Sequence, residues 1–204
     1  MTPRTTLALD GSSIDGSAYK DVTHLAAHAP GWVDHVVSAW STYGLAVFAG
    51  LMLVAWWRAR RKSATAAVAA LAVPVVVVVA YALNDVVKML VREDRPCQRL
   101  HVATLEACPA PGDWSFPSNH AAIAAAAAVA LLYVTRRLGA VAIAGAIAMG
   151  ASRVWVGVHY PHDVAAGLLT GAVVGALLMA GVRRWPHPLA RRLAATRLRP
   201  LLVA

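Results

Sequence analysis

Long apolar runs alternate with short polar stretches along most of this chain. Five runs, at about 36–57, 65–87, 118–134, 138–156 and 164–182, contain few charged side chains and are each about 17 to 23 residues long. A helix rises about 1.5 Å per residue, so runs of this length can cross the hydrocarbon core of a bilayer, which is about 30 Å thick. The pattern predicts an all-α, integral-membrane helical bundle of about five transmembrane helices over residues 36–182.

The segment 13–30 carries a weaker apolar pattern. Its apolar residues recur at roughly helical spacing, with charged and imidazole side chains between them: Tyr19, Val22, Leu25 and Ala26. Such a segment is too polar to span a membrane and is typical of an amphipathic helix at the interface. Residues 1–21 lack the charged segment and apolar core of a cleavable signal peptide.

The last apolar run, 164–182, carries a ridge of small side chains at Gly167, Gly171 and Gly175. Small residues every four positions let two helices approach closely, so we expect this face to pack against a neighbouring helix. No internal repeat divides the chain, and we expect one membrane domain over residues 1–204.

The distribution of charge sets the expected orientation. The chain is 59% hydrophobic and has a formal net charge of +9, which could suggest a nucleic-acid partner. Twelve of its 19 Lys and Arg residues, however, lie in three clusters without acidic residues, at 58–62, 136–137 and 183–199. Each cluster follows an apolar run, as the positive-inside rule expects of cytoplasmic segments. We therefore expect a multi-pass plasma-membrane protein with a basic cytoplasmic tail at 183–204 and no nucleic-acid partner.

This orientation puts the loop 89–117 and all ten acidic residues on the outer side of the membrane. A loop of this length in a compact membrane protein is usually functional. Its two cysteines, Cys97 and Cys108, would lie in an oxidising compartment, where a disulfide is favoured over two free thiols. In the chain-entropy description, closing this short loop would stabilise the fold by roughly 3 kcal/mol.

Three polar islands interrupt the apolar pattern between residues 88 and 163. The first contains Lys88 and Arg95, seven residues apart. If the second helix continues outward to Pro96, both cations lie on one helix face and could bind a phosphate. Snorkelling membrane anchors are the common alternative for a Lys and an Arg at a helix end.

The second island, Ser118-Asn119-His120, directly precedes an apolar run. Ser118 is a natural N-cap, and the N–H groups that open a helix bind anions. His120, in the first turn, would reach the same anion. An ordinary interfacial histidine is the alternative.

The third island contains Arg153, His159 and Asp163. A carboxylate four residues after a histidine can bind one ring nitrogen and leave the other free to attack an electrophile. A metal site would also use His and Asp. Because Lys88, Arg95 and Arg153 would repel a metal and suit an anion, we expect no metal and no cofactor.

Together the islands resemble the three-part signature of the type 2 phosphatidic acid phosphatase superfamily. The resemblance rests on Lys88 with six residues before Arg95-Pro96, on 117–120, and on Ser152-Arg153 with five residues before His159 and three before Asp163. It implies a metal-independent phosphatase with a phosphohistidine intermediate. By that resemblance His159 is the nucleophile, Asp163 orients it, and His120 protonates the leaving oxygen and then activates water. The implied phosphate-binding residues are Lys88, Arg95, Ser118, Asn119 and Arg153.

Asn119 departs from the family pattern, which usually has Gly there. Because Asn tolerates left-handed backbone angles, we expect the anion-binding turn to be retained. His162 is outside the signature, and we interpret it as a rim residue that either contacts substrate or is structural. Glu93 and Asp94 either tune the site or solvate the loop.

The short chain, the amphipathic N-terminal segment and the stretches around 94–97 and 115–121 resemble the bacitracin-resistance type of undecaprenyl-diphosphate phosphatases. This implies hydrolysis of a polyprenyl diphosphate, undecaprenyl or decaprenyl, to the monophosphate on the outer face, with lipid phosphate and membrane lipids as partners. A phosphatase of phosphatidic acid, phosphatidylglycerophosphate or a prenyl-phosphosugar is the alternative within the same class. A non-catalytic lipid-binding or transport protein is the alternative of another class.

Overall fold

The computed structural model describes residues 10–197 and 199–202, and no strand occurs among them. Their helices, in chain order, are α1 (Gly11–Ala27), α2 (Gly31–Arg60), α3 (Ala64–Val91), α4 (Pro96–Leu100), α5 (Asn119–Val134), α6 (Arg136–Trp155), α7 (Pro161–Arg184), α8 (Pro186–Ala194) and α9 (Arg199–Leu202). The predicted all-α fold is confirmed.

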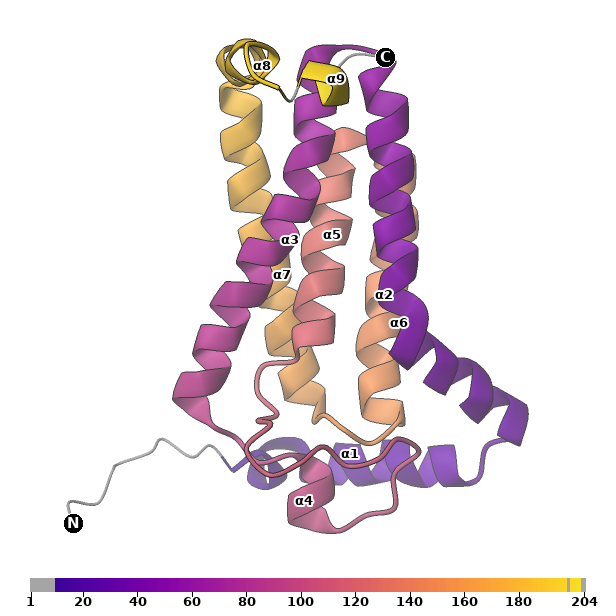
Figure 1. Cartoon of the computed structure of the whole chain (residues 1–204). Helices are drawn as coiled ribbons and strands as arrows, with labels where there is room; N and C mark the ends of the chain where they lie inside the picture. Colours follow the sequence, from indigo (N-terminus) through magenta and orange to yellow (C-terminus); the bar gives the residue numbers. More distant parts are fainter. Residues whose placement is uncertain (1–9, 198, 203–204) are drawn as a thin grey trace, which may run out of the picture.

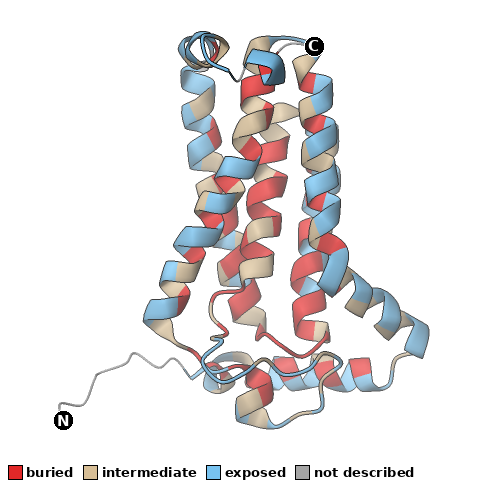
Figure 2. Cartoon of the chain, in the orientation of Figure 1, coloured by how far each residue is buried: buried red, intermediate tan, exposed pale blue. Residues whose placement is uncertain are grey.

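Helices α2, α3, α5, α6 and α7 run along the length of the bundle, with α5 in the middle (Figure 1). α5 packs against α2, α3, α6 and α7, and Figure 2 shows that its buried residues extend along most of its length. Nine of its residues are buried, and eight of these are alanines. Alanine lacks a bulky side chain, so four neighbouring helices can approach this helix at once.

Four of the predicted spans are confirmed as helices that are long and apolar enough to cross a membrane: α2, α3, α6 and α7. The remaining run, 118–134, forms the apolar helix α5, which has 16 residues and is the shortest of the five. Proline at position 74 lies inside α3 without ending it.

The glycine ridge of α7 packs on α5, as predicted. A Cβ atom added to Gly171 would lie 2.1 Å from the carbonyl oxygen of Ala122, and one added to Gly167 would lie 2.4 Å from that of Ser118. Only glycine allows backbones to approach so closely. This contact holds the start of α7 against the start of α5.

The two ends of the bundle differ in charge. α1, α4 and the segment 101–118 cover one end, and α8 and α9 lie at the other (Figure 1). The ten acidic residues occur at the α1 end, at the N-cap of α1 and within α1, at the start of α2 and α7, in the last two turns of α3, and in the segment after α3. The basic clusters lie at the α8 end, where α2 ends, α6 begins and α7 continues into α8.

α1 lies across its end of the bundle, as an interfacial amphipathic helix would (Figure 1). It packs against α4, α6 and α7. Tyr19, Thr23 and Ala26 are buried on its inner face, while Lys20 and His24 are exposed. The backbone kinks at Asp15, whose φ of −143° is not helical.

Candidate active site

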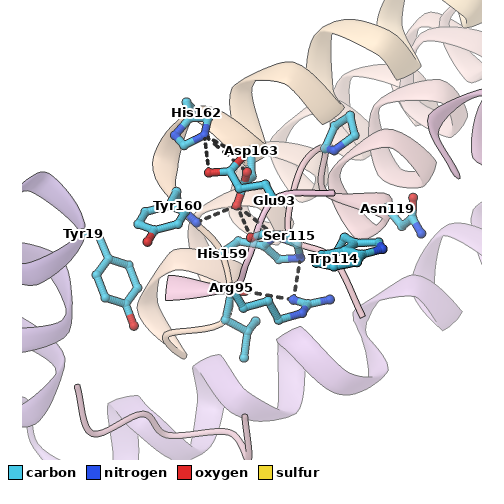
Figure 3. Close-up of polar contacts among 12 residues, drawn as sticks. Tyr19, Glu93, Arg95, Trp114, Ser115, Asn119, His159, Tyr160, His162 and Asp163 are labelled. Carbon is cyan, nitrogen blue, oxygen red and sulfur yellow. Dashed lines mark hydrogen bonds and ion pairs between the residues drawn. The ribbon is translucent and has the colours of Figure 1, made fainter. Parts of the chain in front are cut away.

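The polar residues of the three islands gather at the α1 end of the bundle, beneath α1 and the segment 101–118. Six of the eight predicted site residues are buried: Lys88, Arg95, Ser118, Arg153, His159 and Asp163. They come from α3, α6 and α7, from the N-cap positions of α4 and α5, and from the segment before α7. Figure 3 shows Arg95, His159 and Asp163 side by side.

His159 lies between a carboxylate and a cation. Its Nδ1 is 3.3 Å from Asp163 Oδ2, and its Nε2 is 3.3 Å from Nη1 of Arg95. Burial lowers the pKa of His159 well below its ordinary value, and the positive charges of Arg95 and Lys88 lower it further. The ring is therefore neutral at pH 7, with Nδ1 donating to Asp163 and the lone pair of Nε2 directed toward the cations.

Asp163 is fixed by several donors to one oxygen. It lies in the first turn of α7, after Pro161, and its Oδ2 accepts from the backbone N–H of Tyr160 at 2.8 Å and from Ser115 Oγ at 2.5 Å. Ser115 Oγ is also 3.4 Å from His159 Nδ1. Ser115 was not among the predicted site residues, because one serine in a long polar loop gives no sequence signal.

Arg95 does not continue α3, contrary to the expectation that one helix carries Lys88 and Arg95. α3 ends at Val91, where Arg92 takes a left-handed φ of 54°, and Arg95 is the N-cap of α4. This sharp turn brings the guanidinium back over the site. Nη1 donates to the carbonyl of Val158, Nε to the carbonyl of Asp113, and Nη2 to the Asp113 carboxylate, each at 2.9 Å.

The segment that carries Asp113 is tied to α4 by a disulfide between Cys97 and Cys108, with a Cα–Cα distance of 5.9 Å. Gln98 Nε2 donates to the carbonyl of Pro109 at 2.7 Å, which reinforces this link. The disulfide therefore joins the start of α4, where Arg95 lies, to the segment that contacts Arg95.

Lys88 and Arg153 also donate to the protein. Lys88 Nζ donates to the carbonyls of Trp114 at 2.6 Å and Ser115 at 3.2 Å. Arg153 Nη1 donates to Ser41 Oγ and forms an ion pair with Glu106 at 3.1 Å. Nε of Arg153 is buried and has no hydrogen-bond partner in the described part of the chain.

Ser118 is the N-cap of α5, as predicted, but its hydroxyl does not cap the helix. Its backbone N–H donates to the carbonyl of Asp163 at 3.0 Å, and its buried Oγ has no partner among the described residues. The first N–H groups of a helix have no helical acceptor, so they and Ser118 Oγ are free to bind an anion.

Asn119 does not need the left-handed backbone angles expected for it. The non-glycine residues with positive φ in the described chain are Arg92 and His101, and Asn119 begins α5. Its side chain instead links α5 to α3: Oδ1 accepts from Asn84 at 2.7 Å, and Nδ2 donates to Asp85 at 3.3 Å. An amide in place of the usual glycine is thus accommodated by two polar residues of α3.

His120 is half-buried in the first turn of α5. It is near enough to His159 to affect the ionisation of that ring electrostatically, together with Arg153. The structure therefore brings all three signature islands to one place. Three cations, a helix N-terminus and a neutral imidazole suit an anion with several oxygens, such as a phosphoryl group.

Comparison with known proteins identifies the family of the chain. The model of the PAP2 superfamily matches residues 69–186. The chain is 28% identical over 154 residues to the undecaprenyl-diphosphatase BcrC of Bacillus subtilis, covering 76% of this chain and 77% of that protein. It is 33% identical over 159 residues to a decaprenylphosphoryl-5-phosphoribose phosphatase of Mycobacterium tuberculosis, covering 78% and 76%.

Among solved structures, a membrane PAP2-type phosphatidylglycerolphosphate phosphatase from Bacillus subtilis has a similar fold. The TM-score is 0.62 and the sequence identity is 22%, over 83% of this chain and 86% of that one. At this identity the similarity concerns the fold.

Proposed function

Because the chain belongs to the PAP2 superfamily, we propose that it hydrolyses a polyprenyl diphosphate to the monophosphate on the outer face of the membrane, through a phosphohistidine intermediate. The observation that carries the proposal is the setting of His159, with Nδ1 on Asp163 and Nε2 directed at Arg95. Two relatives bear names that specify polyprenyl-linked phosphates, which supports a polyprenyl substrate.

The reaction has two steps. Nε2 of His159 attacks the terminal phosphorus, the bond from phosphorus to the bridging oxygen breaks, and the polyprenyl monophosphate leaves with a proton from His120. His120 then removes a proton from water, the resulting hydroxide attacks the phosphorus, the bond from phosphorus to Nε2 breaks, and inorganic phosphate leaves the neutral His159 ring. Asp163 accepts the Nδ1–H of His159 throughout and stabilises its positive charge.

Charge on the phosphoryl oxygens would be stabilised by Lys88, Arg95 and Arg153, with Ser118 Oγ and the N–H groups that open α5. Two of these cations are paired with carboxylates, Arg95 with Asp113 and Arg153 with Glu106. A bound phosphoryl group would replace these carboxylates as the partner of both guanidinium groups.

The distribution of charge supports the orientation. The basic clusters lie at the α8 end, so the positive-inside rule assigns that end and the C-terminus to the cytoplasm. The site at the α1 end would then face outward, at the level of lipid headgroups.

A prenyl-phosphosugar is the second candidate substrate, favoured by the 33% identity to the mycobacterial phosphatase. The deciding experiment measures phosphate release by the purified full chain from four substrates: undecaprenyl diphosphate, decaprenylphosphoryl-5-phosphoribose, phosphatidic acid and phosphatidylglycerophosphate. We expect the highest kcat/KM for the diphosphate. Faster turnover of either glycerolipid would refute a polyprenyl substrate.

The variant His159→Ala separates catalysis from lipid binding. We expect it to insert and to elute from size-exclusion chromatography as the wild type does, without releasing phosphate. Activity retained by this variant would refute the assignment of the nucleophile, and no release by the wild type from any substrate would favour a non-catalytic lipid-binding protein.

A further inference from the structure

His162, which the signature does not include, contacts carboxylates from three different segments. Its Nδ1 is 2.8 Å from Asp15 Oδ1 in α1, and its Nε2 is 3.1 Å from Glu93 Oε1, in the segment between α3 and α4. The same Nε2 is 3.5 Å from Oδ1 of Asp163, the carboxylate that binds His159. The rings of Phe116 and Tyr160 both stack near the imidazole, with centroid distances of 5.8 and 5.4 Å.

Both nitrogens of His162 therefore face carboxylate oxygens. An ionised carboxylate only accepts hydrogen bonds, so both ring nitrogens must donate, and a histidine that donates from both nitrogens is an imidazolium. The surroundings favour this charge, because Glu93 and Asp163 are 1% and 0% exposed. Two buried carboxylates side by side are stabilised either by a shared proton or by a cation between them, and His162 lies where that cation would be.

Oδ1 of Asp163 has no hydrogen-bond partner in the described part of the chain, and Nε2 of His162 forms an ion-pair contact with it at 3.5 Å. All the hydrogen bonds that Asp163 receives end on the other oxygen, from Tyr160, Ser115 and His159. On the Oδ1 side, His162 therefore supplies the positive charge that favours the ionised carboxylate, with a further contribution from Lys88. Burial raises the pKa of Glu93, and the hydrogen bond from His162 opposes that rise.

The same ring holds α1 over the site. Besides the contact to Nδ1, Asp15 accepts from the backbone N–H of His162 at 2.7 Å. This contact occurs where α1 is kinked. Gly11 of α1 lies so close that a Cβ atom there would be 1.8 Å from Glu93 Oε1 and 2.8 Å from the His162 ring.

We propose that His162 is a positioning residue of the phosphatase, whose imidazolium holds the Asp163 carboxylate ionised and in place for His159 and ties α1 over the site. The inference rests on the phosphatase activity proposed above. The charged and titratable groups that face this ring are Asp15 from α1, Glu93 from the segment before α4, and Asp163 and Tyr160 at the start of α7. Lys88 of α3 and His159 also lie near the Asp163 carboxylate.

The charge of His162 predicts the pH dependence of the reaction. Without the imidazolium, Glu93 and Asp163 face each other as like charges, so the pair holds a proton up to a higher pH. The reaction needs an ionised Asp163 and a neutral His159. Loss of the positive charge would therefore move the acid limb of kcat/KM upward in pH, whereas loss of a neighbouring negative charge would move it downward.

The experiment compares His162→Gln, which keeps a donor toward Glu93 and Asp163 but carries no charge, with Glu93→Gln. We expect His162→Gln to lower kcat roughly tenfold with little change in KM, as loss of outer partners of catalytic groups does. The acid limb of kcat/KM for His162→Gln should lie about one pH unit above the wild-type limb. The acid limb for Glu93→Gln should lie below the wild-type limb. His24→Gln, which changes an exposed histidine of α1, the helix that His162 contacts through Asp15, is the control.

Several outcomes would overturn the inference. Wild-type kcat and an unchanged acid limb in His162→Gln would exclude a role in positioning Asp163, and shifts in the same direction for both variants would exclude the charge argument. If His162→Gln does not insert, the profile of Glu93→Gln still decides, because an unchanged acid limb there contradicts the proposal.

Glu93, His162 and Asp163 also have ligand atoms within 4.8 Å of one another, as a metal site would. Loss of activity in EDTA, restored by zinc, would assign the cluster to a metal and refute the imidazolium. No phosphate release by the wild type and by His24→Gln would instead count against the proposed function itself.

Discussion

At the scale of single residues, the site is defined by which atoms hold protons. His159 is fully enclosed and its ring has a different partner at each nitrogen, Asp163 and Arg95. Burial and the neighbouring cations disfavour the charged imidazolium, so the pKa of His159 is lowered. A lowered pKa means that the unprotonated, nucleophilic form persists as the pH falls through the ordinary range of histidine.

The direction of this pKa shift of His159 can be measured directly. In the full chain labelled with ¹⁵N-histidine, we expect His159 to stay neutral, with its proton on Nδ1, at pH 6, below the ordinary histidine pKa of about 6.5. The signal is assigned by its loss in His159→Gln. A His159 ring that becomes charged near pH 6.5 would contradict the assignment of Nε2 as a free nucleophile at neutral pH.

Asp113 gives a second prediction at this scale. Its exposed carboxylate accepts from Nη2 of Arg95, while its backbone carbonyl accepts from Nε. Asp113→Asn removes the competing charge and keeps the carbonyl. Because a phosphate would then meet less competition for Arg95, we expect KM to fall about two- to fivefold with kcat unchanged, in keeping with the modest strength of an exposed ion pair. A higher KM would show that Asp113 instead orients Arg95.

At the scale of helices, the position of the site depends on how closely α5 and α7 approach. Ser118 begins α5 and Asp163 lies in the first turn of α7, and the backbone N–H of Ser118 donates to the carbonyl of Asp163. Glycines of α7 along the same contact allow the two backbones to meet. Helix packing therefore sets the distance between the N-terminus of α5, the proposed anion-binding group, and Asp163, the proposed partner of the nucleophile.

Two glycines of α7 test this packing. A methyl group at Gly171 would lie 2.1 Å from the carbonyl oxygen of Ala122, whereas one at Gly181 meets nothing within 4 Å. We expect Gly171→Ala to destabilise the fold by about 1 to 3 kcal/mol through overpacking, and to lower activity. Gly181→Ala should be neutral or slightly stabilising, since alanine favours helix. Thermal unfolding of both variants in detergent measures the difference, and equal unfolding temperatures would contradict it.

At the scale of the whole molecule, much of the arrangement follows from patterns in the sequence. Apolar runs predicted the bundle because membrane helices must be long and apolar, and the signature predicted that residues 75 positions apart, Lys88 and Asp163, share one site. Ser115 and Asp15 could not be predicted in this way. Their contacts depend on the path of a loop and on where an interfacial helix lies, and neither leaves a periodic pattern. The end of α3 was misplaced because Arg92, not glycine, adopts the left-handed angle there.

The orientation of the molecule in the membrane is the remaining prediction at this scale. Positive residues at the α8 end and acidic residues at the α1 end predict that the site and the disulfide loop face outward. In intact cells treated with a reductant, we expect a membrane-impermeant maleimide to label Cys97 and Cys108, the two cysteines of the chain. The double variant Cys97→Ser/Cys108→Ser is the control, and a fluorescent protein fused after residue 204 should be protected from external protease. Labelling only after permeabilisation would place the site on the cytoplasmic side, and the proposed hydrolysis on the outer face would then be wrong.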